Sequence, residues 1–414
     1  MIVPAIRRFR LFARRLWVRA ALVSLTALVA AFLAPLSNYL PFSLADRIDA
    51  ATLQDLLDIL TNSMLTVTTF SLSIMVAAHL AADSSTTPRA HRLLQQDPRT
   101  QTVLATFIGA FVYALALTIM LSSGLFAPDE MALIYFFTVG VIAFVVVAIL
   151  RWVGHLDGLG SVEATTRSAE ESARDAVARR ARAPFLGARA PAPVPEGAHE
   201  VRSAESGYVA EIEAEDLSAL AGEWGGTIHL AAGPGDWVVT GDVLAHVAAE
   251  AWSEARASQV RGRIEVSDRR RQGQDTVFSL VVLAEIGEKA LSPGINDPRT
   301  GIDVIGRITR LILSLPPERA ADAPVAPHLH APGLDPEEML RTTLDPVARD
   351  GRDFHEVAMA VQRAARALSR HGDPGIAGAA RLLSARALAY ARDGSMLGED
   401  LKRIAAAAPA GGAG

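Results

Sequence analysis

Long apolar stretches fill much of the first 150 residues of the chain. Four of them are candidate membrane spans, at about residues 17–36, 56–82, 101–123 and 131–150. The first holds about 20 residues, which at about 1.5 Å per residue crosses the ~30 Å hydrocarbon layer of a bilayer. We therefore expect residues 1–160 to form a domain of four transmembrane helices.

Positive charge gathers on one side of these spans. Arginines precede the first span at Arg7, Arg8, Arg10, Arg14 and Arg15, and Arg19 lies near its start. A basic segment before an apolar run also marks signal peptides, but the long run and the later spans favour an uncleaved anchor. The connection after the second span also carries arginines, whereas the first connection carries only Arg47 and the third carries none. The positive-inside rule then places both termini, and everything after Arg151, in the cytoplasm.

The second span is more polar than the others, and its polar side chains share one face. At about 100° per residue they fall within about 80° of one another, and the same face continues inward with apolar residues. The candidate pore-lining residues on this face are Asp58, Asn62, Thr66, Thr69, Ser73, Val76 and Leu80. A polar outer half that leads to an apolar collar is typical of a wetted vestibule with a hydrophobic gate.

Packing between helices is the alternative interpretation of this face. Serine and threonine hydroxyls then bond their own preceding carbonyl groups, while Asn62 and Asp58 bond neighbouring helices. Asp58 favours a functional role, because a carboxylate within a span is costly and normally faces water or a partner. In the third span, Ala105 and Gly109 form a pair of small residues that permits close approach of another helix.

The segment after the fourth span is expected to connect two domains. Ser161 caps a predicted helix that reaches about Arg182, with acidic residues in its first half and arginines at its end, as a helix dipole favours. Residues 183–198 contain four prolines and form a predicted linker, so that residues 161–200 as a whole are a connector.

Residues 201–250 predict a small β-module. Short alternating strands are separated by the turn dipeptides Gly235-Asp236 and Gly241-Asp242. The closing part is similar to the barrel-sandwich fold of lipoyl and biotinyl carriers. The only lysines, Lys289 and Lys402, lie outside it, which excludes a carrier of a swinging cofactor arm and leaves an interaction module.

Residues 251–414 predict a cytoplasmic helical domain. Four Asp-Pro pairs offer an N-cap followed by a proline suited to the first turn, and they begin at Asp297, Asp335, Asp345 and Asp373. Asp353 with Glu356 predicts a capping box. Residues 316–336 contain six prolines and predict a long mobile loop that interrupts the bundle.

The most specific string of the chain is the corner Ser292–Pro298, which joins a predicted amphipathic helix from Phe278 to Leu291 to a second predicted helix of about residues 298–314. With Asp275 and Phe278 before it and Thr300 after it, this corner resembles the hallmark of a bacterial family of predicted membrane proteins, domain of unknown function 2254. The residues of the second and third spans agree, so the similarity covers nearly the whole chain. It implies four spans with a cytoplasmic tail in the bacterial inner membrane, without an established activity; Glu285 departs from the family's usual aspartate.

The corner has two interpretations. In the structural one, Gly294 takes a left-handed conformation, Asn296 closes an Asx turn and Asp297 caps the next helix. In the functional one, polar residues converge on one pocket that uses the helix N-terminus to hold an anion. The candidate residues for a cytoplasmic ligand or structural corner are Asp268, Asp275, Glu285, Ser292, Gly294, Asn296 and Asp297.

A nearby arginine cluster offers a second candidate contact for an anion or a lipid headgroup, at Arg269, Arg270 and Arg271. Acidic residues are interspersed with these arginines, which favours an ordinary ion-paired surface.

Composition narrows the function further. The 414 residues are 50% hydrophobic and 21% charged, which argues against a wholly soluble globule. A net charge of −5 gives no basic excess for nucleic acid, and the absence of cysteine removes thiolate metal sites and cysteine nucleophiles. We find no catalytic motif, and His328 with His330 lacks carboxylate partners, so we expect no enzyme, no cofactor and no metal site.

Together these patterns predict a mostly α membrane protein: four transmembrane helices, then a cytoplasmic α+β domain of a small barrel- or sandwich-like module and a helical bundle. The leading hypothesis is a homo-oligomeric ion channel or channel-like transporter, lined by the second span and gated by the cytoplasmic domain. The alternative is a membrane-anchored sensor or scaffold that binds a ligand or protein partner through the cytoplasmic domain.

Overall fold

The computed structural model describes residues 16–34, 50–85, 87–95, 98–127, 130–156, 160–317 and 323–409. Two compact units divide the chain. The first unit contains the residues up to Ser84 together with His91–Ala164, and the second contains Ser85–Ala90 together with Thr165 onward. Arg7 to Arg15, Arg47 and residues 318–322 of the predicted loop lie outside the described residues.

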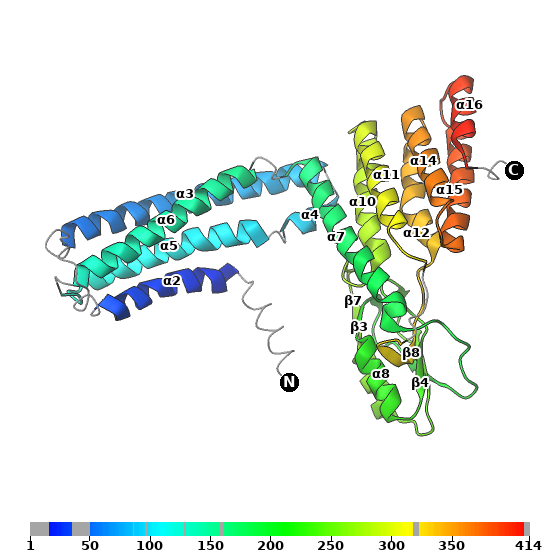
Figure 1. Cartoon of the computed structure of the whole chain (residues 1–414), viewed down its shortest axis with the longest axis horizontal. Coiled ribbons are helices and arrows are strands. Elements are labelled where there is room, and N and C mark those ends of the chain that lie inside the picture. The colour runs from blue at the N-terminus through cyan, green and yellow to red at the C-terminus, as the bar shows by residue number, and fades with distance from the viewer. Residues whose placement is uncertain are drawn as a thin grey trace. The chain divides into compact units, whose positions relative to one another are not determined.

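The first unit is helical (Figure 1). Its helices are α2 (Leu16–Leu33), α3 (Ala50–Ser85), α4 (Pro88–Gln95), α5 (Pro98–Ser122) and α6 (Met131–Leu156), and α4 begins within the second unit. Three of them contain a stretch long and apolar enough to cross a membrane: Ala50–Leu80, Thr100–Ser122 and Met131–Leu156. The apolar part of α2, Ala20–Leu33, is shorter, so the described residues support three of the four predicted spans.

Helix α5 supplies much of the core of the first unit. Phe107, Tyr113 and Leu117 are fully or almost fully buried, and the cluster extends to Leu57 of α3 and Ile134 of α6. The small residues predicted to permit close approach of another helix do lie at such a contact. The Ser24 Oγ of α2 lies 3.4 Å from the carbonyl oxygen of Gly109, so one small side chain of α2 reaches the α5 backbone.

Helix α7 (Val162–Arg182) starts in the last residues of the first unit and continues into the second, and Ser161 caps it through a 3.1 Å hydrogen bond from Ala164 N. A short 3-10 turn, η4 (Pro184–Gly187), follows. The strands are β1 (Ala188–Arg189), β2 (His199–Arg202), β3 (Gly207–Ile212), β4 (Thr227–Leu230), β5 (Trp237–Val238), β6 (Val243–Ala248), β7 (Ile264–Ser267) and β8 (Ala326–His330). Helices α8 (Ala214–Glu223) and α9 (Glu254–Arg261) lie between strands in the sequence.

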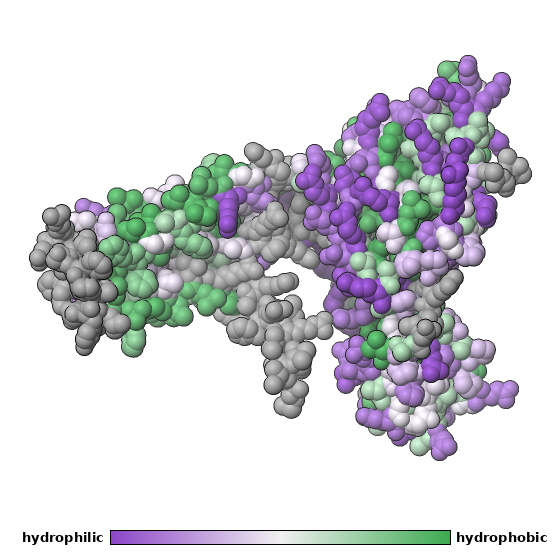
Figure 2. All heavy atoms as spheres, viewed as in Figure 1, coloured by the Kyte–Doolittle hydropathy of each residue, from purple (hydrophilic) through white to green (hydrophobic). Residues whose placement is uncertain are grey.

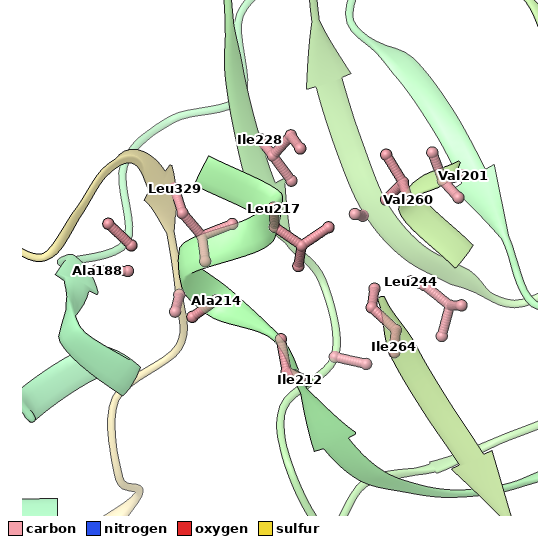
Figure 3. Close-up of a cluster of buried hydrophobic side chains, with 14 of the residues drawn as sticks. Ala188, Val201, Ile212, Ala214, Leu217, Ile228, Leu244, Val260, Ile264 and Leu329 are labelled. Carbon is pink, nitrogen blue, oxygen red and sulfur yellow. The ribbon is translucent and has the colours of Figure 1, made fainter. Parts of the chain in front are cut away.

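These strands form two sheets around one hydrophobic core. A mixed five-stranded sheet has the order β1-β8-β4-β6-β2, and an antiparallel three-stranded sheet has the order β5-β3-β7. Leu217 of α8 packs in this core with Ile228 and Leu329, as Figure 3 shows. Both predicted Gly-Asp turns are present, because Gly235 and Gly241 have φ of 99° and 97° and the aspartates bond back to the loop backbone.

The β-module therefore differs from the barrel-sandwich prediction. It includes a helix and recruits β8, which lies within the predicted mobile loop of residues 316–336 and forms an inner strand of the sheet. The prolines of that loop misled the sequence prediction, because a proline normally argues against an inner strand. The segment Ala326–His330 contains Pro327 and nevertheless pairs with β1 and β4.

The rest of the second unit is a helical bundle: α10 (Thr276–Leu291), α11 (Pro298–Leu313), α12 (Pro336–Thr342), α13 (Leu344–Asp350), α14 (His355–Leu368), α15 (Pro374–Asp393) and α16 (Gly398–Ala407). Three predicted caps are confirmed. Asp297, Asp335 and Asp373 accept backbone N–H groups at the starts of α11, α12 and α15.

Two predicted caps are wrong, and in both a tertiary partner takes the carboxylate. Asp345 lies inside α13 and accepts from Arg386 Nε at 2.8 Å, while Thr343 occupies the N-cap position. Asp353 accepts from Ser395 N at 2.9 Å, and α14 starts after Phe354 without a side-chain cap. An arginine or a distant amide supplied by the fold thus replaces the local helix start as hydrogen-bond donor.

Candidate functional site

Helix α3 carries the polar face predicted from the sequence. Its buried side chains recur every three or four residues, at Leu53, Leu57, Leu60 and Met64, which is the spacing of one helical face. This face packs against the core of the first unit. It fixes the rotation of α3 and therefore the direction in which the remaining side chains point.

The predicted pore-lining residues all lie on the opposite, exposed side of α3. Asp58, Asn62, Thr66, Thr69, Ser73, Val76 and Leu80 are exposed in the protomer. At about 100° per residue this stripe is centred about 180° from the buried leucines. Large apolar residues border it, with Ile59 and Phe70 on one side and Leu65 and Leu72 on the other, and all four are exposed. No helix of the described first unit covers the stripe.

The hydroxyl groups of the stripe are satisfied within α3 itself. Thr66, Thr69 and Ser73 donate to the carbonyl oxygens of Asn62, Leu65 and Thr69 at 2.9, 2.9 and 3.0 Å. These hydroxyl hydrogen bonds agree with the packing interpretation, because they lower the free-energy cost of placing a hydroxyl group in lipid. Within the described residues, however, neither the Asp58 nor the Asn62 side chain makes a hydrogen bond to a neighbouring helix, so that part of the packing interpretation is wrong for a single protomer.

The three apolar stretches differ strongly in how much the protomer covers them. Of the most apolar window of Ala50–Leu80, 11% is buried, against 56% for Thr100–Ser122 and 28% for Met131–Leu156. Helix α3 is thus both the most polar span and the least covered one. Its polar stripe requires something outside the described protomer, whether water, lipid or another copy.

The end of the stripe formed by Val76 and Leu80 is approached by Gly160, which lies between α6 and α7. Gly160 has φ +81°, and a Cβ added to it would lie 2.7 Å from the carbonyl oxygen of Ala78. Glycine is needed there for both its left-handed backbone and the close approach. Ala78 lies between Val76 and Leu80, so Gly160, two residues before α7, contacts α3 next to these two apolar residues of the stripe.

The chain that leaves α3 is held by Glu285 of α10, within the second unit. Thr87 Oγ1 donates to Glu285 Oε2 at 3.1 Å, and Arg89 forms an ion pair with the other carboxylate oxygen. One helical turn later, burial and the nearby Asp350 raise the pKa of Glu288. Glu285, singled out above as a departure from the family pattern, therefore holds the exit of the second apolar helix.

The corner between α10 and α11 is explained by helix capping. Asp297 Oδ1 accepts from Arg299 N and Thr300 N at 3.1 Å each, and Thr300 Oγ1 donates to the other oxygen at 2.6 Å. These hydrogen bonds, that of the Thr300 hydroxyl first, lower the pKa of Asp297. Asn296, with φ +55°, takes the left-handed conformation that the sequence had assigned to Gly294. Ser292 donates its hydroxyl to the Lys289 carbonyl oxygen at 2.6 Å.

The candidate pocket that joined the corner to the upstream aspartates does not exist. Asp275 caps the start of α10, where Phe278 N donates to it at 2.8 Å, whereas Asp297 follows the end of that helix. A helix of 16 residues is about 24 Å long, so the two carboxylates cannot share one ligand. Sequence proximity had suggested a cluster that the length of α10 separates.

Asp275 and the arginine cluster serve the fold of the second unit. Arg270 Nε donates to Asp275 Oδ2 at 2.6 Å, yet burial outweighs this ion pair and raises the pKa of Asp275. Arg271 pairs with Glu265 at 2.8 Å, and Arg269 lies 3.5 Å from Asp268 on the surface. Each predicted anion contact therefore has an acidic partner within the chain, as expected for an ion-paired surface.

A row of histidines across the large sheet was missed by the sequence reasoning. His229 of β4 pairs in register with His246 of β6 and with His330 of β8, and the His229 and His330 rings stack with centroids 4.4 Å apart. Burial, and then the neighbouring His330, lower the pKa of His229. Among the described residues, no group of three potential ligands is arranged to hold a metal ion. Only the pairing of three distant strands reveals this row.

Comparison with known proteins identifies the family. A family model described as "Predicted membrane protein (DUF2254)" matches residues 13–367, which includes α3, the α10–α11 corner and α14. No curated protein and no solved structure matches the chain. Because the match covers most of the sequence, the chain belongs to this family of predicted membrane proteins.

Proposed function

We propose that this protein is an oligomeric ion channel or channel-like transporter of a bacterial inner membrane, with copies of α3 around a shared water-lined path. The observation that carries the proposal is the outward direction of the polar stripe. It points away from the core of its own protomer, and an aspartate and an amide on it lack partners within the described chain.

Lipid is an unfavourable neighbour for this face. An aspartate near the centre of a span costs about 2.5–3.5 kcal/mol on insertion scales, and an unpaired amide adds to that cost. Asp58 lies toward one end of Ala50–Leu80, which lowers the penalty without removing it. A second copy of the same face, with water between them, satisfies Asp58 and Asn62 and hides the stripe from lipid.

A symmetric oligomer would enclose the water-lined path that a single protomer cannot enclose. Copies related by cyclic symmetry would present identical stripes to one axis, and the apolar borders of each stripe would contact the neighbouring copies. Asp58 and Asn62 would then face the vestibule, while Val76 and Leu80, which are 50% and 68% exposed in the protomer, would form the collar.

The second unit is suited to control whether the collar is open. Its helix α10 holds the segment that follows α3, and its helix α11 holds α7, which follows Gly160. Glu285 of α10 binds Thr87 and Arg89 just after α3. Glu170 of α7 binds Arg307 and Arg310 of α11, and Gly160, two residues before α7, approaches Ala78. The proposal places this unit and both termini in the cytoplasm.

The test is ion flux through liposomes that contain the full chain. Wild-type protein is expected to conduct, and Val76→Ser or Leu80→Ser should increase flux several-fold, because a hydroxyl wets the apolar collar. The matched control is Leu150→Ser in α6, which removes a leucine of the same 68% exposure outside α3. No flux from wild type or from either collar variant would refute the channel.

The second candidate function is a membrane-anchored sensor or scaffold that binds a protein partner through the second unit. The observation in its favour is that the hydroxyls of the stripe are already satisfied by the α3 backbone. It predicts that Asp58→Leu leaves the cellular activity intact, whereas substitutions on the second unit abolish it.

A further inference from the structure

An open groove of about 520 Å³ lies between α11 and α14 in the second unit. Its lining is mostly apolar, with Ile302 and Leu313 from α11 and Ala360 and Ala364 from α14. Gly306 faces this space, because a Cβ built on it would meet no atom within 4 Å. The small residues of both helices thus leave a hollow that the described chain does not fill.

Positive charge borders the groove. Arg299, Arg310 and Arg363 line it, with Glu356 as the acidic residue of the same lining. Within the described part of the chain, Arg299 and Arg363 have no acidic partner, while Arg310 pairs with Glu170 and yet keeps 61% of its side chain exposed. Figure 2 shows hydrophobic surface beside hydrophilic surface over these helices. The complementary ligand has an apolar body and an anionic end.

The volume and the lining of the groove suit a small amphiphile. Small-molecule sites commonly measure about 300–1,000 Å³ and are lined mainly by apolar side chains with a few polar groups. One alkyl chain with a charged end fits both limits.

We propose that the groove between α11 and α14 binds a single-chain anionic amphiphile, with its alkyl chain over Gly306 and its carboxylate or phosphate on the bordering arginines. Binding itself does not require conduction. Its consequence rests on the proposed function: an anion on Arg310 competes with Glu170, loosens α7 from α11 and so affects Gly160, which lies two residues before α7 and contacts Ala78 beside the collar.

Photolabelling of the full chain in nanodiscs of zwitterionic lipid tests the binding. The probes are palmitate and a lysophosphatidic acid, each with a diazirine in the alkyl chain, and peptide mass spectrometry locates the adducts. We expect labels on peptides of α11 and α14. Gly306→Leu should reduce them at least five-fold by filling the groove, while the matched Gly378→Leu in α15, where an added Cβ also meets no atom within 4 Å, should not.

The charged border is tested with the same probes. Arg299→Gln combined with Arg363→Gln should reduce labelling about ten-fold, whereas Arg381→Gln, an exposed arginine of α15, should leave it unchanged. A stronger effect on one probe tells whether the site prefers a carboxylate or a phosphate. Equal labelling of the Gly306→Leu and Gly378→Leu proteins, or labels confined to the first unit, would overturn the proposal.

Flux measured with and without palmitate separates this proposal from the channel. Groove labelling in a protein that conducts nothing would refute the channel and leave the binding site standing. Conduction that palmitate does not alter, despite groove labelling, would refute the coupling through Arg310. Conduction without groove labelling would refute the binding site and leave the channel intact.

Discussion

Four carboxylates of the second unit and the Asp58 carboxylate of α3 differ in whether the protomer supplies them with hydrogen-bond or ion-pair partners. Glu170, Asp275, Asp297 and Asp345 each receive an arginine, a helix N-terminus or both. Asp58, by contrast, lies exposed on a span without a hydrogen-bond partner among the described residues. The structure of one protomer therefore explains the acidic residues of the second unit but leaves Asp58 unexplained, which is why the functional proposal begins at α3.

Removal of Glu170 should have the largest effect on stability. Burial alone would raise the pKa of this carboxyl, but hydrogen bonds from Arg310 and Arg307 outweigh burial and lower it. Glu170→Ala removes the 2.5 Å partner of Arg307, which keeps Asp303 at 2.6 Å, and should lower the free energy of unfolding by about 2 kcal/mol. Denaturant unfolding of the purified protein measures this. A loss below about 1 kcal/mol would show that the pair does not hold α7 to α11.

Acidification should destabilise the second unit through His229. Burial lowers the pKa of this histidine in the folded state, so the unfolded chain takes up the proton first as the pH falls below about 6.5. Stability is then lost with a slope of up to about 1.4 kcal/mol per pH unit until the folded pKa is reached. His229→Gln should flatten this slope between pH 7 and 5. An unchanged slope would show that protonation of His229 does not destabilise the second unit.

The link between α3 and α10 should have a moderate coupling energy. Arg89 is half exposed while Glu285 is largely buried, so a double-mutant cycle with Arg89→Ala and Glu285→Ala should give about 0.5–1 kcal/mol. The reference pair is Arg202 and Glu200, both exposed, whose coupling should be smaller. A coupling energy near zero for Arg89 and Glu285 would remove the contact by which α10 holds the exit of α3.

Asp58 should have the smallest effect on stability. Because the Asp58 side chain is exposed and unpartnered within the described residues, Asp58→Asn should change the unfolding free energy of the detergent-solubilised protomer by less than about 0.5 kcal/mol. Its effect is expected in cation flux, which should fall as the vestibule loses charge. A large loss of stability would instead show that Asp58 is bound within the protomer, and the contrast with the second unit would disappear.

Local sequence was a good guide wherever the partners of a residue lie within a few positions. The capping aspartates Asp297, Asp335 and Asp373 and the turns at Gly235 and Gly241 follow from neighbours in the chain, and the structure has them as predicted. The same reasoning failed for Asp345 and Asp353, because Arg386 and Ser395 approach them from more than forty residues away.

For the candidate sites, too, the sequence predicted what depends on local periodicity and failed where the answer depends on tertiary packing. Helical periodicity alone placed the polar residues of α3 on one face, since 3.6 residues per turn leave little freedom. Periodicity could not tell whether that face points into the first unit or away from it, because the direction depends on where Leu57 and Phe107 meet. The helix predicted from Phe278 to Leu291 is confirmed as α10, and its length alone separates Asp275 from Asp297, although both had been assigned to one candidate pocket.

The sequence by itself determined the apolar helices, the composition of the α3 stripe, most of the helix starts and the family, since each depends on short-range periodicity or on a local motif. Only the tertiary structure decided that β8 belongs inside a sheet, that three histidines form a row, and that Glu285 holds the chain leaving α3. These features join residues about 20 to 200 positions apart, and which pairs meet is set by the packing of whole elements, for which local preference carries no information.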